Sequence, residues 1–175
     1  MFEFQIIFIS GVHGVGKSFL CSRINEIFSL PIFSASSLIK DLKKSEIDVD
    51  KRVIDAGNNQ DYLISALNNL NPQSKAIILD GHFCLYGSDG IIDIGIKTFE
   101  SMRLKSIITL HDVPEKIYKR MHERDGKSLD VDIINSLQER ELELARFTAD
   151  QLNVRLHIIS ANESLKNLKW IEELL

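Results

Sequence analysis

Apolar residues gather in short runs along the chain, separated by longer amphipathic stretches. Residues 4–10, 76–80 and 105–111 are rich in Ile, Leu and Phe without strict alternation, which is typical of strands covered on both faces. Residues 30–33 and 154–159 are runs of similar character. We expect these segments to be the strands of the main sheet.

The stretches between these runs carry the period of amphipathic helices. Helices are predicted over residues 17–28, 36–44, 49–69, 114–124, 129–152 and 164–175. A polar turn around Ser45 and Glu46 is expected to separate the second helix from the third, and Asn71-Pro72 to stop the third. Gly87-Ser88-Asp89-Gly90, between residues 82–86 and 91–94, predicts a small hairpin.

Alternating strands and helices predict an α/β fold with a mainly parallel sheet and helices on both faces. The 175 residues suit a single domain. A hydrophobic fraction of 44% and a charged fraction of 26% are typical of globular proteins, and the net charge of −4 does not favour a nucleic-acid partner. The apolar amino terminus has no basic leader, so we interpret it as a buried strand and not as a signal peptide.

No apolar run approaches the roughly 18 residues of a membrane span. The two cysteines, Cys21 and Cys84, lack the spacing of a disulfide framework or a zinc site. We therefore expect a cytoplasmic protein without a membrane partner.

The segment from Gly11 to Ser18, Gly-Val-His-Gly-Val-Gly-Lys-Ser, is a complete phosphate-binding loop between a predicted strand and a predicted helix. Its glycines let the backbone approach phosphates, and its N–H groups form a concave anion site at a helix N-terminus. Lys17 supplies a cation for the β- and γ-phosphates, and the Ser18 hydroxyl can bind Mg²⁺. We expect ATP to contact Gly11, His13, Gly14, Val15, Gly16, Lys17, Ser18 and Phe19, although the pattern leaves the His13 position free.

Asp80 ends a predicted buried strand, and ligands of parallel sheets bind at that end of the strands. Its carboxylate is predicted to help hold Mg²⁺ or to accept a proton from an attacking hydroxyl; the alternative is a simple turn residue in Asp80-Gly81. His82, two residues later, is predicted either to contact the substrate or to hydrogen-bond the loop backbone.

Arg120 and Arg124 lie four residues apart on one predicted helix, beside the break at Asp125-Gly126. We interpret them as catalytic arginines of a lid that closes over the transferring phosphate; a solvated basic helix end is the alternative. On the next helix, Glu141 falls on the apolar stripe. It is predicted either to pair with a lid arginine or to mark a wider or shifted stripe.

About forty mostly helical residues separate the second strand from Asp80. We expect this insertion to bind the phosphoryl acceptor, with Arg52 as a fork for an acceptor phosphate and Gln60 as a reader of a base edge; a solvated helix pair is the alternative. The remaining polar candidates there are Ser34, Ser36, Lys40 and Asn59.

Three segments together resemble the adenylate-kinase-like branch of P-loop nucleotide kinases: residues 9–18, residues 78–82 and residues 120–125 with the long helix that follows. The archaeal-type enzymes are the most similar in layout. Asp80-Gly81-His82 also resembles the D-x-H element of an atypical adenylate kinase subgroup that is linked to ribosome assembly.

The resemblance implies a three-layer P-loop fold with five parallel strands in the order 2-3-1-4-5, an acceptor region at about residues 34–70 and a short lid at about residues 120–130. It implies Mg²⁺-ATP as the phosphoryl donor, with Lys17 and Ser18 serving ATP and Mg²⁺, Asp80 as the second acidic element, and Arg120 and Arg124 in the lid.

These patterns favour an ATP-dependent phosphotransferase whose acceptor is a nucleoside monophosphate. One alternative is a kinase for a hydroxyl acceptor, such as a nucleoside or a sugar acid, with Asp80 as the base. Another is an ATP-hydrolysing switch or assembly factor that uses the hairpin as a partner surface, suggested by the apolar residues Phe83, Leu85 and Tyr86.

Overall fold

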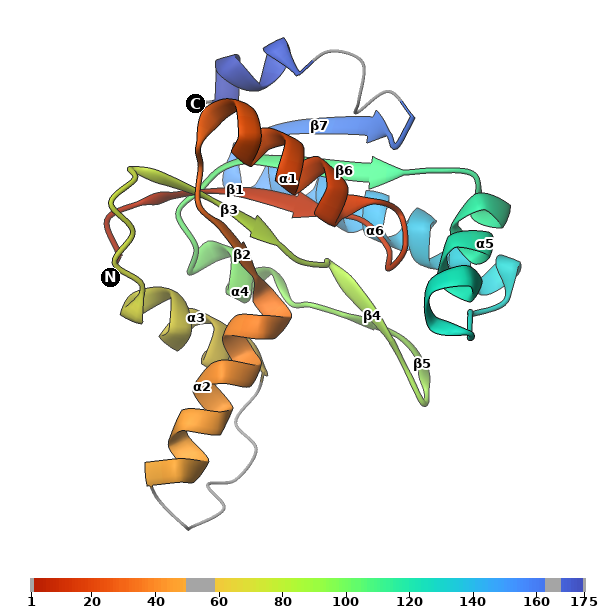
Figure 1. The fold of residues 1–175 in the computed structure, drawn as a ribbon, viewed down its shortest axis with the longest axis horizontal. Coiled ribbons are helices and arrows are strands. Elements are labelled where there is room, and N and C mark those ends of the chain that lie inside the picture. Colours follow the sequence, from red (N-terminus) through yellow and green to blue (C-terminus); the bar gives the residue numbers. More distant parts are fainter. Residues whose placement is uncertain (1, 50–58, 163–167, 175) are drawn as a thin grey trace.

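A five-stranded sheet forms the centre of the protein (Figure 1). The computed structural model describes residues 2–49, 59–162 and 168–174. The strand order is β2-β3-β1-β6-β7 and every neighbouring pair is parallel, which confirms the expected order 2-3-1-4-5. The strands are β1 (Gln5–Ser10), β2 (Ile32–Ser34), β3 (Ala76–Asp80), β6 (Leu104–His111) and β7 (Arg155–Ser160).

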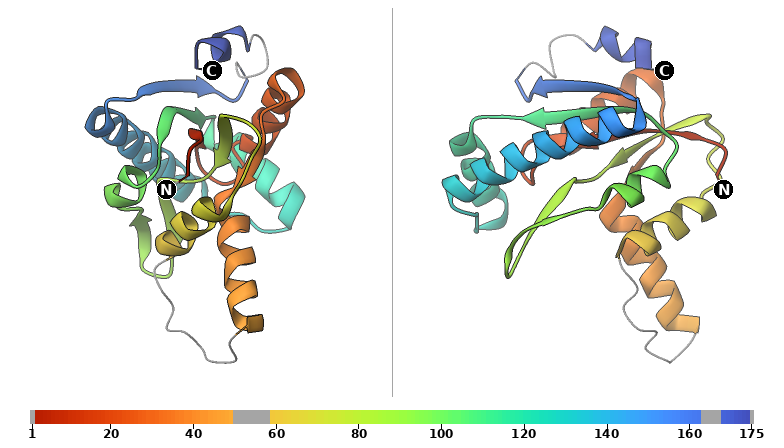
Figure 2. Two further views of the ribbon diagram at one scale, coloured as in Figure 1. Left: turned by 90° about the vertical axis from the view of Figure 1, so that its left-hand side faces the viewer. Right: turned by 180° about the vertical axis from the view of Figure 1, so that it is seen from behind.

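Helices cover both faces of this sheet, as Figure 2 shows from two further directions. The helix α1 lies on one face, whereas α6 runs along the other. The helical elements are α1 (Lys17–Phe28), α2 (Ala35–Val49), α3 (Asn59–Asn69), α4 (Ile96–Glu100), α5 (Pro114–Asp125), α6 (Val131–Leu152) and the 3₁₀ helix η1 (Lys169–Leu174). This arrangement is the predicted α/β fold. No helix in the described ranges is long and apolar enough to cross a membrane.

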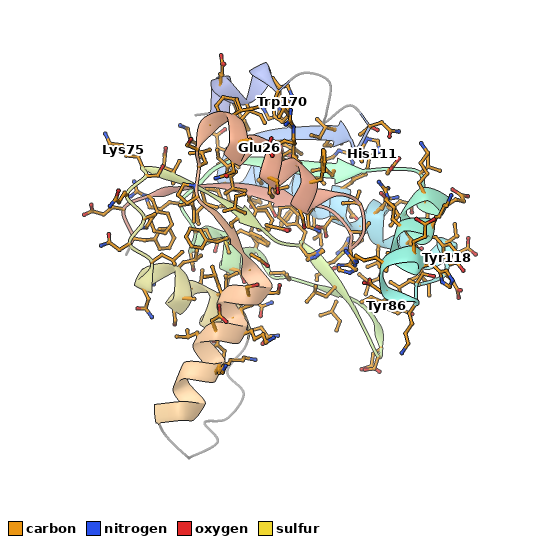
Figure 3. All side chains as sticks on the ribbon, viewed as in Figure 1. Glu26, Lys75, Tyr86, His111, Tyr118 and Trp170 are labelled. Carbon is orange, nitrogen blue, oxygen red and sulfur yellow. The ribbon has the colours of Figure 1, made fainter. Side chains whose placement is uncertain are left out.

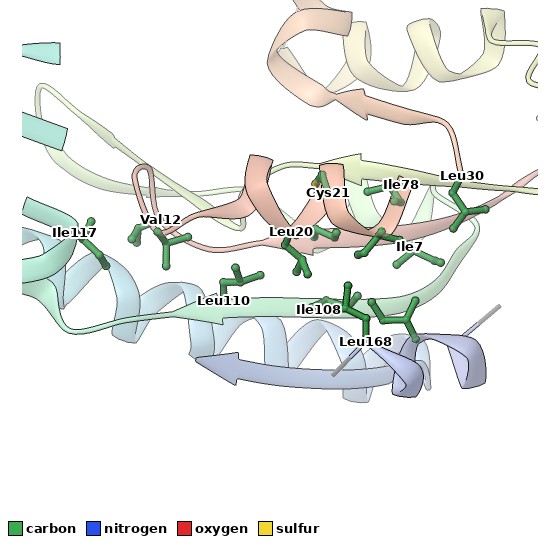
Figure 4. Close-up of a cluster of buried hydrophobic side chains, with 14 of the residues drawn as sticks. Ile7, Val12, Leu20, Cys21, Leu30, Ile78, Ile108, Leu110, Ile117 and Leu168 are labelled. Atoms are coloured by element: carbon green, nitrogen blue, oxygen red, sulfur yellow. The ribbon is translucent and has the colours of Figure 1, made fainter. Parts of the chain in front are cut away.

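The central strand β1 is buried on both faces, as its continuous apolar run predicted. Ile7 and Ile9 point into one buried cluster, which includes side chains of α1 and α5 (Figure 4). Ile6 and Phe8 point into the other cluster, with side chains of α3, α4 and α6. Burial of both faces fixes the register of β1, and it thereby fixes where the chain enters the phosphate loop.

The predicted hairpin is present as β4 (Cys84–Gly87) and β5 (Gly90–Asp93). The structure differs from the expected elements at α2 and α4. The turn expected at Ser45 and Glu46 is absent, because α2 continues to Val49; both residue types are tolerated inside helices. The short helix α4 was not predicted, since five residues are too few to show a period. Parts of the helices predicted over residues 49–69 and 164–175 lie outside the described residues.

The carboxyl ends of the parallel strands meet at one edge of the sheet. Asp80 at the end of β3 lies opposite Ile9 of β1 and Ser34 of β2. Between β1 and β6, the hydroxyl oxygens of Ser10 and Thr109 are 2.8 Å apart and buried. The segments that follow β1, β3 and β6 therefore start beside one another.

Candidate functional site

The phosphate loop leaves β1 and turns into α1 through residues with positive φ. The φ angles are 136° at Gly11, 79° at Gly14 and 116° at Gly16. Residues with a Cβ adopt such angles only under strain. Lys17 opens α1 and its Nζ donates to the carbonyl oxygens of Gly11 at 2.6 Å and Val12 at 3.3 Å. The loop therefore wraps around its own lysine.

Lys17 is buried, and it lies beside the partly buried side chains of Asp80 and His82. Its Nζ lies 3.9 Å from Oδ1 of Asp80 and 3.5 Å from Nε2 of His82. Burial lowers the pKa of Lys17, while the Asp80 and Glu141 carboxylates act in the opposite direction. Burial likewise raises the pKa of Asp80, against the nearby charge of Lys17. The pKa of His82 falls to about 3, through burial first and the charge of Lys17 second, so His82 is neutral beside the lysine.

Helix α5 brings both predicted arginines to this edge. Arg120 Nη2 donates to Oδ2 of Asp112 at 2.5 Å, and that carboxylate is almost fully buried. Arg124 donates to Nε2 of His13 in the phosphate loop and to Oδ2 of Asp125 at 2.6 Å. Burial, and then the charges of Arg124 and Lys17, lower the pKa of His13, which keeps its ring nitrogen available as an acceptor.

The phosphate loop and α5 also pack tightly together. A Cβ placed on Gly14 would lie 2.6 Å from Cγ of Met121. Met121 and Ile117 are buried in the same cluster as Val12 and Val15 of the loop. Helix α5 and the loop are therefore in direct contact, and a side chain at position 14 would separate them.

A cavity of about 790 Å³ opens at the carboxyl edge of the sheet. From the phosphate loop and its flank it is lined by His13, Gly14, Gly16, Lys17, Ser18 and Phe19. Asp80, His82, Arg120 and Arg124 face the same space. Four of the acceptor-side candidates also line it, namely Ser34, Ser36, Asn59 and Gln60. The structure thus brings residues from five separate segments to one space.

The amino ends of the strands lie at the opposite edge of the sheet from the cavity. Figure 3 shows Lys75, which precedes β3, on the far side of the molecule from Tyr118 of α5 and Tyr86 of the hairpin. Lys75 is exposed and does not line the cavity.

The residues expected to hold Mg²⁺ are compatible with it. The Ser18 hydroxyl and the Asp80 carboxylate line the same cavity. Within the described ranges no group of three or more His, Cys, Asp or Glu side chains could enclose a metal. Beside nucleotides, Mg²⁺ usually has only one or two protein ligands, and water and phosphate oxygens complete its coordination.

A family model described as an AAA domain matches residues 10–138 of the chain. The chain belongs to this AAA domain family. The matched range begins just before the phosphate loop and ends within α6, so it includes Lys17, Asp80, Arg120 and Arg124. No curated protein matches the chain significantly.

Solved structures share the fold of this AAA domain protein. A Bacillus subtilis YorR protein in complex with phosphorylated GDP has a TM-score of 0.56, 18% identity, and coverage of 91% of this chain and 87% of that one. An uncharacterized protein from Eubacterium ventriosum has a TM-score of 0.53, 14% identity, and coverage of 97% and 98%. A gluconokinase from Sinorhizobium meliloti has a TM-score of 0.51, 18% identity, and coverage of 99% and 89%. At these identities the similarity shows the fold.

Some residues that were predicted to contact ATP or the acceptor do not line the cavity. Within the loop, Val15 is fully buried and Gly11 is also buried, and neither lines the cavity. Lys40 is exposed on α2 and does not line the cavity either. Arg52 lies outside the described residues. Phe83, which the sequence suggested as part of an exposed hairpin surface, is fully buried because it packs against Phe8 and Phe99.

Three buried polar residues support the site although sequence reasoning did not assign their roles. Asp112 comes directly after β6, at the edge of the sheet where Asp80 ends β3, so the same strand-end rule could have found it. Gln138 exchanges two hydrogen bonds with the backbone of Asp112, at 2.9 and 3.0 Å. Glu141 accepts from the backbone N–H groups of Gly11, Phe83 and Cys84. The structure shows no pairing of Glu141 with Arg120 or Arg124.

Proposed function

We propose that the protein is an ATP-dependent phosphotransferase of the adenylate-kinase-like type and that its acceptor is a nucleoside monophosphate. The observation that carries the proposal is the shared cavity of about 790 Å³, a volume in the range of small-ligand sites. The phosphate loop faces one part of it and the acceptor-side residues face another. Donor and acceptor can therefore meet in a single space, as in-line phosphoryl transfer requires.

The acceptor side of the cavity has an apolar floor. Phe8, Leu63, Phe99 and Met102 line it, and all four are buried in one hydrophobic cluster. A flat heterocyclic base fits such a surface, whereas a sugar acid with many hydroxyl groups would lose hydrogen bonds there. Gln60 lines the same space, and its amide can both donate to and accept from a base edge.

The chemical roles follow from charge and position. Lys17, Arg120 and Arg124 place three cationic groups around the space where phosphate charge develops. Mg²⁺, when bound, adds charge neutralisation at the phosphates. Ser18 and Asp80 would hold it. His82 stays neutral and offers a hydrogen bond without adding charge.

A hydroxyl acceptor is the second candidate, and the partly buried carboxylate of Asp80 favours it. Burial raises the pKa of Asp80, which makes the carboxylate a better base for a hydroxyl proton. A gluconokinase is also among the structures that share the fold. Transfer to a phosphate acceptor needs no such base, so Asp80→Asn should reduce hydroxyl transfer far more than phosphate transfer, if ATP affinity is retained.

The exposed hairpin motivates the third candidate, an ATP-hydrolysing switch. Leu85, Tyr86, Ile91 and Ile92 are 44%, 46%, 38% and 53% exposed. Such a protein would hydrolyse ATP slowly and respond to a protein partner, not to a small acceptor.

A phosphoryl-transfer screen separates the three candidates. Protein with Mg²⁺-ATP is offered each nucleoside monophosphate, several nucleosides and sugar acids, and ADP formation is followed. Lys17→Ala is the inactive variant, and Lys75→Ala, at an exposed lysine away from the cavity, is the matched control. Fast ADP formation with one nucleoside monophosphate supports the proposal, and dependence on a nucleoside or sugar acid moves the assignment to a hydroxyl kinase. Slow hydrolysis that ignores every acceptor contradicts both kinase assignments.

A further inference from the structure

Glu141 is a carboxylate buried in the middle of α6. Its side chain is 1% exposed, and it lies on the helix face that also buries Leu137 and Ala145. It does not line the cavity. A carboxylate in such a place is expensive to desolvate unless donors surround it.

The donors come from two backbone segments that are far apart in sequence. Oε1 accepts from the N–H of Gly11 at 3.0 Å and from the N–H of Phe83 at 2.9 Å. Oε2 accepts from the N–H groups of Phe83 and Cys84, both at 2.9 Å, and from the Cys84 thiol at 3.4 Å. The Glu141 carboxylate thus links the first glycine of the phosphate loop to the residues that directly follow Asp80-Gly81-His82.

Every one of these partners is a donor, so only an ionised carboxylate satisfies them all. Glutamine in its place would keep one acceptor oxygen and turn an NH₂ group towards N–H groups. The charge of Glu141 also acts on Lys17, since it opposes the lowering of the lysine pKa by burial. The hydrogen bonds of Glu141 therefore act on Gly11, and its charge acts on Lys17, both in the phosphate loop.

We propose that Glu141 is a positioning residue for the donor nucleotide: it holds Gly11 in register with the segment that carries Asp80 and His82, so that the phosphate loop is formed before ATP arrives. This inference rests on the proposed function only in assigning a phosphoryl-transfer reaction to the site. Its direct consequence is nucleotide affinity.

The experiment compares Glu141→Gln with Leu137→Ala in the full chain. Leu137 lies one turn earlier on α6, is 6% exposed and belongs to the hydrophobic core, so its truncation lowers stability while leaving the carboxylate in place. For each variant we would measure the melting temperature, the Kd for Mg²⁺-ATP without acceptor, and the KM for ATP and for the acceptor. All measurements are made at least about 15 °C below the lowest melting temperature, a margin of several typical mutational shifts.

Both variants are expected to melt earlier than the wild type, but only Glu141→Gln should bind ATP less tightly. Its Kd and KM for ATP should rise at least about tenfold, equivalent to about 1.4 kcal/mol, with the KM for the acceptor changed less than about threefold. Unchanged ATP affinity in Glu141→Gln, or an equal loss in Leu137→Ala, would show that Glu141 only stabilises the fold and would overturn the inference.

Two further arms keep the test decisive. If Glu141→Gln does not fold, Glu141→Asp replaces it: the shorter side chain keeps the charge but cannot reach both segments, and an ATP Kd equal to that of the wild type would overturn the inference. If the wild type transfers phosphate to no acceptor, the proposed function fails. The comparison of ATP Kd values still decides the role of Glu141.

Discussion

Arg120 is held in place by a carboxylate that lies outside the cavity. Asp112 Oδ2 accepts from Arg120 Nη2 at 2.5 Å, and Oδ1 accepts from the N–H of Val113 at 2.9 Å. Gln138 fixes the backbone of Asp112 in turn. The arginine is thereby anchored to the end of β6 and does not depend on the substrate for its orientation.

Removing the charge of Asp112 should release Arg120. We expect Asp112→Asn to lower kcat about 10- to 100-fold, because small displacements of a charge-stabilising group are costly in the transition state, with a smaller change in the KM for ATP. Steady-state kinetics test this, with Asp150→Asn as the control, since Asp150 is exposed near the far end of α6. Equal kcat values for Asp112→Asn and the control would contradict it.

The ring of His82 should make stability depend on pH. Its pKa of about 3 in the folded protein lies below the ordinary value of about 6.5. When the pH falls below about 6.5, the unfolded chain therefore binds more protons than the folded protein does. The stabilisation that comes from keeping His82 neutral is therefore fully present above about pH 6.5, and it is lost as the pH falls from there towards 3. Between pH 7 and pH 5 we expect His82 to account for about 1–2 kcal/mol of this loss.

Urea unfolding of the wild type and of His82→Gln at both pH values measures this contribution. Other titrating groups are shared by the two proteins and cancel in the comparison. The variant should lose less stability on acidification, and an identical loss in both proteins would count against a depressed pKa for His82.

At the scale of elements, α6 connects the parts that surround the cavity. Glu141 contacts the phosphate loop and the start of the hairpin, and Gln138 contacts the end of β6. Arg140 Nε and Nη2 donate to Asp93 of β5 at 3.0 and 2.5 Å. Three side chains within four positions of one helix thus hold three separate segments.

The ion pair between Arg140 and Asp93 should reduce local opening of the hairpin. Both side chains are partly exposed, at 35% and 40%, so Arg140→Ala should lower global stability by no more than about 1 kcal/mol. Hydrogen exchange of the amides in residues 84–93 should nevertheless accelerate, because the hairpin loses its clamp to α6. Arg146→Ala, at an exposed position on the same helix, is the control and should leave that exchange unchanged.

The elements of the fold were largely predictable, and the exceptions have physical causes. Strong patterns, such as the buried run of β1 or the Pro114 start and Gly126 end of α5, determined their elements. The five residues of α4 were too short to show a helical period, although Phe99 in it forms part of the cavity floor. Polarity alone suggested a turn at Ser45, where helix propensity permits α2 to continue.

At the scale of the whole molecule, nucleotide binding should stabilise the folded chain. Mg²⁺-ATP at about 100 times its Kd should add about 2.7 kcal/mol and raise the melting temperature accordingly. Lys17→Ala should abolish this increase, whereas Lys75→Ala should retain it. Thermal unfolding with and without Mg²⁺-ATP checks the prediction, and an equal increase in Lys17→Ala would mean that the ligand binds elsewhere.

The candidate site was predictable where one motif or one strand end defines a residue, as at Lys17 and Asp80. It was not predictable where the role depends on distant contacts. Glu141 lies 130 positions after Gly11 in the sequence, and only the packing of α6 beneath the loop shows which donors it meets. The shared cavity likewise depends on side chains from segments that no local pattern joins.

The sequence distance between the phosphate loop and its partners also has a consequence for the timing of its synthesis. The central strand β1 pairs with β3 and β6, which begin at Ala76 and Leu104, and Glu141 comes later still. At about 5–20 residues per second on the ribosome, on the order of ten seconds pass between synthesis of the phosphate loop and synthesis of this last anchor. The phosphate loop is thus translated well before the strands and the carboxylate that hold it in place.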